Sequence, residues 1–118
     1  MPSFDALGPI YGDSFTVLGS TTATATAQSP AVPSGQYNTL RLTLNVTAAS
    51  GTTPSMTVTI ETSSTGSGGW TSVGAFAAAT AVSTQQKVFS GLDRFVRANY
   101  AISGTTPSFT FSVTGQAL

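Results

Sequence analysis

Residues 40–60 read LRLTLNVTAASGTTPSMTVTI, and this stretch decides the fold class. In its first seven residues, Leu and Val alternate strictly with polar side chains. Successive side chains of a β-strand point to opposite faces, so this alternation predicts a half-buried strand over 40–46. The alternation returns in MTVTI, which predicts a second strand over 56–60. The polar segment SGTTPS separates the two strands, and we predict that they form a β-hairpin.

The same design repeats near the C-terminus, where residues 103–113 read SGTTPSFTFSV against SGTTPSMTVTI at 50–60. Seven of eleven positions are identical, namely the six residues of SGTTPS and one Thr, at an offset of 53 residues. This repeat predicts a second hairpin, built from strands over 95–102 and 109–113. Either a duplication of half of the chain or the recurrence of one hairpin sequence without duplication accounts for this repeat.

The faces of the second unit follow from the same alternation. Val96 and Ala98 are predicted to face inward, and Phe95 and Arg97 to face outward. At the offset of 53 residues, however, the inward Leu42 aligns with Phe95, which is the wrong face. Because a slip of one residue turns every side chain of a strand over, the two units must differ by a bulge or in loop length.

Four further segments are predicted as strands, at 15–18, 22–27, 70–76 and 86–89. Clusters of Gly, Pro and Ser separate them, and no long helical pattern is present. About eight short strands with turn signals between them indicate an all-β protein, namely a two-sheet antiparallel β-sandwich of jelly-roll-like form. The number of strands leaves jelly-roll and immunoglobulin-like topologies open.

The first 13 residues, MPSFDALGPIYGD, differ from the rest because their apolar side chains do not alternate. Gly8-Pro9 breaks any helix in this segment. We therefore predict an extended N-terminal arm over 1–13 and a single β-sandwich domain over 14–118. The apolar side chains of the arm are predicted to lie against the domain itself or against a neighbouring subunit; they are Phe4, Leu7, Ile10 and Tyr11.

Composition excludes several classes of function. The 118 residues include no Cys, no His, four Lys or Arg and four Asp or Glu, for a net charge of zero. Thiolate and imidazole metal sites are therefore excluded, as is a His general base. Four scattered cations make no basic patch for nucleic acid. No segment approaches the ~20 apolar residues of a membrane span, and the start lacks the pattern of a secretory signal.

Catalytic constellations are not expected either. The four carboxylates are not spaced as an acid–base pair. A Ser nucleophile needs a base, and Lys87 is the only Lys. The glycine-rich STGSGG lacks the Lys of a phosphate-binding loop. We predict no catalytic residue, no metal site and no cofactor, so that the chain is not an enzyme.

Aromatic and Arg side chains are the remaining candidates for binding. Trp70 is predicted to be a core or rim residue, or else a platform that stacks on a sugar, with Tyr11 or Tyr37 beside it. The outward-facing Phe95 and Arg97 are predicted to contact another subunit, because Arg and aromatic side chains are enriched at the centres of interfaces.

Two stretches carry a resemblance to a known group: GGWTSVGAF at 68–76 and VFSGLDRFVRANYAISGTTPSFTFSVTG at 88–115. A Trp-bearing strand, a GL-x-RFVR turn and strand, and then SGTTPSFTFSV resemble small β-sandwich structural proteins of tailed bacteriophages, of the head-decoration or cement type. The resemblance covers roughly the last fifty residues. It implies that Trp70 belongs to the fold and that Arg94 and Arg97 mark the following strand.

This resemblance implies a non-enzymatic virion protein, assembled in the host cytoplasm, that stabilises the phage shell by bridging subunits. The expected partners are the phage major capsid protein or other virion subunits, together with further copies of the chain in a homo-oligomer, and neither nucleic acid nor a membrane. The expected interface combines the apolar side chains of the arm with Phe95 and Arg97. The alternative is a carbohydrate-binding β-sandwich module of a phage fibre or tail.

Overall fold

The computed structural model describes residues 14–34 and 37–117, so the predicted arm and its interface residues lie outside the described residues. The described part is all-β and antiparallel, and none of it forms a helix suited to crossing a membrane. Its strands are β1 (Ser14–Ala23), β2 (Ala27–Gln28), β3 (Val32–Pro33), β4 (Thr39–Ser63), β5 (Thr71–Ala75), β6 (Ser83–Ser90) and β7 (Phe95–Ala117).

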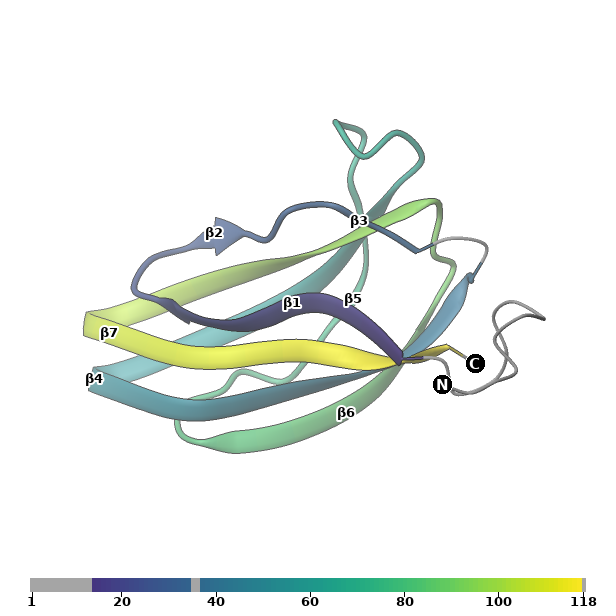
Figure 1. The fold of residues 1–118 in the computed structure, drawn as a ribbon. Coiled ribbons are helices and arrows are strands. Elements are labelled where there is room, and N and C mark those ends of the chain that lie inside the picture. Colours follow the sequence, from purple (N-terminus) through teal and green to yellow (C-terminus); the bar gives the residue numbers. More distant parts are fainter. Residues whose placement is uncertain (1–13, 35–36, 118) are drawn as a thin grey trace.

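The two long strands, β4 and β7, organise the whole fold. They pair with each other from Leu40 opposite Ala117 to Ser63 opposite Phe95, and both bend sharply midway. Each therefore contributes one half to each of two layers (Figure 1). The first layer has the order β1, second half of β7, first half of β4, β6. The second has β2 and β3, first half of β7, second half of β4, β5. The predicted all-β antiparallel sandwich is confirmed, but within the described residues its two layers are halves of one continuous seven-stranded sheet and not two separate sheets.

The predicted hairpins are wrong. Leu44 pairs with Val113, and Met56 pairs with Ile102, so the strands on either side of each SGTTPS segment do not pair with each other. Instead, SGTTPS is a corner at which one continuous strand passes from the first layer to the second. Alternation predicts which side chains face inward, but it does not specify the partner strand.

The two SGTTPS corners have the same backbone conformation and face each other. Gly51 and Gly104 have φ values of 115° and 119°, and Thr53 and Thr106 have φ values of 46° and 47°. A Cβ on Gly51 would lie 2.8 Å from the carbonyl oxygen of Thr106, and one on Gly104 would lie 2.8 Å from that of Thr53. The repeat therefore builds a pseudo-two-fold corner. The register shifts between β4 and β7 fall in and beside it, which explains the change of face between the two units.

Both halves of both long strands send side chains into one core. Two edge-to-face aromatic pairs pack there: the ring centroids of Phe76 and Phe89 are 5.2 Å apart, as are those of Tyr100 and Phe111. Burial of this apolar surface stabilises the sandwich at roughly 25 cal/mol per Å². The largest fully buried side chains are Phe89, Phe109, Phe111, Leu40, Leu42, Leu44, Met56, Ile60, Val46, Val58, Val96 and Val113.

Polar side chains close the open side between β6 and β5. Lys87 Nζ donates to the carbonyl oxygen of Ala75 at 2.8 Å. The Gln85 amide binds both the N–H and the carbonyl oxygen of Ala77, each at 2.9 Å. A charged side chain turned toward the neighbouring layer is one way in which proteins protect an edge strand from further pairing.

Candidate interaction site on the outer face of the second layer

The outer face of the second layer carries the outward residues of β7. Val96 and Ala98 are fully buried, so Phe95, Arg97 and Asn99 point away from the core, as the alternation predicts. Glu61 of β4 lies directly opposite Arg97 in the register. The central strands of this layer therefore bring an acidic and a basic side chain together on one face.

Arg97 is held on two sides. Its Nε donates to Glu61 Oε1 at 2.7 Å, and its guanidinium carbon lies 4.3 Å from the centroid of the Trp70 ring. The side chains of Arg97 and Glu61 are only 23% and 16% exposed. A guanidinium that both stacks on an indole and pairs with a carboxylate has little rotational freedom left, so this group is ordered before any partner arrives.

Amide side chains extend the cluster across the face. Asn99 Nδ2 donates to Glu61 Oε2 at 3.4 Å, and Gln28 Nε2 of β2 donates to Asn99 Oδ1 at 3.4 Å. We call Gln28, Asn99, Glu61, Arg97 and Trp70 the Trp–Arg cluster. It spans β2, β7 and β4 and the residue that precedes β5, so it crosses the full width of the second layer.

The glycine-rich loop at 64–69 positions Trp70. Ser63 Oγ binds the carbonyl oxygen of Gly68 and accepts hydrogen bonds from the backbone N–H of Thr65 at 3.2 Å and of Gly66 at 3.1 Å. Gly66 has a φ of 79°, and a Cβ there would lie 3.0 Å from Phe95 Cγ. The loop therefore rests on the Phe95 ring, which ties Phe95 to the same site.

The sequence pattern indicates Trp70 and Arg97 as separate candidates, and the structure brings them into contact. The pattern gives no sign that Glu61 and Asn99 are the partners of Arg97, although Glu61 is the one charged residue in β4 beyond the corner. The Tyr residues do not join Trp70 within the described residues. Tyr37 and Tyr100 pack against the core, and Tyr11 lies outside the described part.

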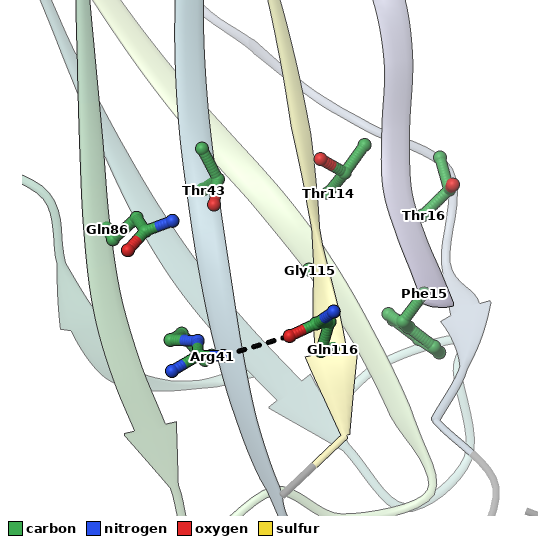
Figure 2. A pocket seen from close by; sticks show the side chains of 8 residues that line it. All are labelled: Phe15, Thr16, Arg41, Thr43, Gln86, Thr114, Gly115 and Gln116. Atoms are coloured by element: carbon green, nitrogen blue, oxygen red, sulfur yellow. Dashed lines mark hydrogen bonds between the residues drawn. The ribbon is translucent and has the colours of Figure 1, made fainter. Parts of the chain in front are cut away.

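A second feature lies on the outer face of the first layer, where a shallow groove of about 460 Å³ crosses all four strands. Figure 2 shows hydroxyl and amide side chains from neighbouring strands lining it. Arg41 is the one charged residue among them, and its Nη2 donates to Gln116 Oε1 at 2.9 Å. Phe15, a residue of β1, lies at one end of the groove.

No group of three or more acidic side chains that could hold a metal ion occurs within 14–34 and 37–117. No family model matches the chain, and no curated protein matches it. The fold is similar to that in a crystal structure of the PBSX exported protein XepA, with a TM-score of 0.58 and 16% sequence identity. That likeness covers 90% of this chain but only 37% of XepA, and it shows the fold alone. Fold and site together define a small antiparallel β-sandwich with an ordered Trp–Arg cluster on one outer face.

Proposed function

We propose that the chain is a non-enzymatic structural protein of a tailed-phage particle, which decorates and cements the shell. In this proposal, the outer face of the second layer docks on shell subunits. The observation that carries the proposal is the Trp–Arg cluster on that face, with Phe95 beside it. Trp and Arg are the residue types most enriched among the few side chains that dominate the energy of protein interfaces.

The ion pair within the Trp–Arg cluster is already formed before a partner binds, as suits a docking surface. Arg97 already has its acidic partner in Glu61 on the same face. A partner therefore covers a charge pair that is already satisfied, rather than desolvating an isolated ion at high cost. The surrounding residues of the face include Thr57, Thr59 and Ala101, which are small and uncharged, so a flat partner can approach closely.

The setting in a phage particle is supported by two likenesses. The residues at 68–76 and 88–115 resemble tailed-phage decoration proteins, and the fold is similar to that of the PBSX exported protein XepA. Low charge also fits, because a surface that carries few charges repels its neighbours little when many copies assemble. A cement protein bridges subunits, so that dissociation of the shell must also break its contacts.

The carbohydrate-binding alternative is less well supported by this geometry. A sugar-stacking platform presents a free aromatic face, usually with a second aromatic side chain in line. The guanidinium of Arg97 covers one face of Trp70, and Tyr37 packs against the core. The same two contacts favour a protein interface, in which a braced Trp–Arg pair is covered as a unit.

The test measures binding of the purified full chain to empty shells of the encoding phage that lack this protein, by co-sedimentation. Arg97→Ala removes both the ion pair and the stacking contact, and it is expected to weaken binding about 10- to 30-fold, typical of a central interface residue. Arg97→Lys keeps the charge but loses the planar contact on Trp70, and an intermediate loss is expected.

The matched control is Thr84→Ala on the outer face of the first layer, where the hydroxyl contacts Asn45 at 3.2 Å. Binding of this variant is expected to be unchanged. Thermal unfolding of each variant separates a lost contact from a lost fold. Equal binding by the wild-type chain and a folded Arg97→Ala variant would contradict the proposed docking face.

A further inference from the structure

The groove on the first layer lies on the face opposite to the Trp–Arg cluster. We propose that the groove of one copy binds the N-terminal arm, residues 1–13, of a second copy. This inference deepens the proposed function and rests on it for its setting: one face would dock on the shell while the other links neighbouring copies. Three observations support it, namely the position of the groove, its charge and its length.

The groove begins where the arm joins the domain. The register gives two rows of residues across the first layer. One row runs Thr16, Thr114, Thr43, Gln86, and the other runs Ser14, Gln116, Arg41, Val88. The second row starts at Ser14, the first described residue, and ends at Val88, whose side chain is 51% exposed. Because the groove crosses the strands, the arm would have to turn back over its own sheet at Ser14 to enter the groove of its own copy.

The charges are complementary. The arm carries Asp5 and Asp13 and no Lys or Arg. The groove carries Arg41, which donates to the neutral amide of Gln116, whereas Arg97 on the other face has its own carboxylate partner. A carboxylate placed on Arg41 would form a charge-assisted hydrogen bond, which is stronger than the bond to an amide.

The length of the arm also agrees with the width of the groove. Neighbouring strands are about 4.8 Å apart, so the four strands of the first layer span about 14 Å between the axes of β1 and β6. An extended chain advances about 3.3 Å per residue, so five residues cross the groove and 13 residues reach about 43 Å. The arm is therefore long enough to leave one copy and cross the groove of the next. Val88, which is exposed on β6 beside the groove, offers an apolar contact to the arm.

Exchange of arms between copies has a simple symmetry. If two copies are related by a two-fold axis, the arm of each lies in the groove of the other, and the same contact is made twice. Once one arm is bound, the second binds at a raised effective concentration.

Disulfide trapping in the full chain tests the arrangement, because the natural sequence has no Cys and therefore no background. One variant carries Ile10→Cys in the arm, and the other carries Gln86→Cys in the groove. After mild oxidation of an equal mixture, we expect a covalent heterodimer. The control replaces Gln86→Cys with Ala101→Cys on the outer face of the second layer, which is expected to give only background cross-linking.

Each other outcome contradicts the proposal. A chain that carries both Ile10→Cys and Gln86→Cys and forms only an intramolecular disulfide would place the arm in its own groove. Cross-linking no greater than in the Ala101→Cys control would exclude the arm as the occupant. Saturation of the groove by an oligosaccharide, with no effect of changes in the arm, would also exclude it and identify a glycan site.

Charge reversal gives a second, independent measurement. Arg41→Glu in one chain, or Asp5→Lys with Asp13→Lys in another, is expected to weaken self-association in solution at least tenfold. Mixing the two variants is expected to restore association, because each mixed pair then matches arm and groove in both directions. No restoration would overturn the exchange. Shell binding that persists while self-association is lost leaves the proposed docking face intact, so the two proposals fail separately.

Discussion

The pseudo-two-fold corner makes a sharp prediction about Gly51→Ala. The Cβ of Ala would lie 2.8 Å from the carbonyl oxygen of Thr106 and 2.9 Å from the Cα of Pro107, both of them backbone atoms that cannot rotate away. Its φ of 115° is also a conformation that residues with a Cβ rarely adopt. Backbone strain of this kind costs about 1–3 kcal/mol, and overpacking costs about 1–3 kcal/mol more.

The sum is about 2–6 kcal/mol out of the ~5–15 kcal/mol that stabilises a typical domain. At about 4 °C per kcal/mol for a chain of this size, the melting temperature is expected to fall by roughly 8–24 °C. Gly104→Ala should cost about the same, because it meets the equivalent atoms of the first corner, starting with Thr53 O at 2.8 Å. Gly68→Ala is the control: no atom lies within 4 Å of its Cβ, and a change within about 0.5 kcal/mol is expected.

The double variant distinguishes the corner from two separate turns. Once one substitution has pushed the two SGTTPS segments apart, the second meets less resistance, so the combined loss should be smaller than the sum by about 1 kcal/mol or more. Urea unfolding of the four chains, followed by circular dichroism, measures this coupling. Additive losses, or a loss below about 1 kcal/mol for either single variant, would refute the reasoning.

Two further substitutions test contacts between neighbouring strands, one within each layer. Ser29 is 4% exposed, and its hydroxyl accepts a hydrogen bond from the backbone N–H of Ala98 at 2.8 Å. Ser29→Ala leaves this buried donor without a partner and is expected to cost about 1–3 kcal/mol in urea unfolding. The control Thr22→Ala removes an exposed hydroxyl contact and should change stability by no more than about 0.5 kcal/mol, so equal losses in the two variants would contradict the prediction. Gly115→Ala would place a Cβ against the backbone carbonyl oxygen of Arg41, so a loss of about 3 kcal/mol is expected in thermal unfolding, and an unchanged melting temperature would contradict this.

The sequence was sufficient to predict the fold class and the inward faces, because alternation is a local property of each strand. Leu42 and Val58, for example, are buried as their positions require. The partners of the strands could not be predicted in this way. SGTTPS fits a tight turn as well as a corner, and only its contact with the second copy of SGTTPS separates the two.

Prediction of the candidate site from the sequence is limited in the same way. Alternation predicts that Arg97 faces outward, and the structure agrees. Its contacts with Glu61 and Trp70 join residues 36 and 27 positions away, and they depend on the pairing of β4 with β7 and on the loop over Phe95. Such contacts are set by the tertiary structure, so spacing along the chain gives no signal for them.

The most direct test of the central claim is the amount of this protein in purified particles of the encoding phage, measured by quantitative mass spectrometry against the major shell protein. A shell-decorating protein is expected at a fixed ratio to shell subunits that persists through density-gradient purification and falls when Arg97 is replaced by Ala. Absence from washed particles, or a trace amount that varies between preparations, would contradict a structural role in the particle.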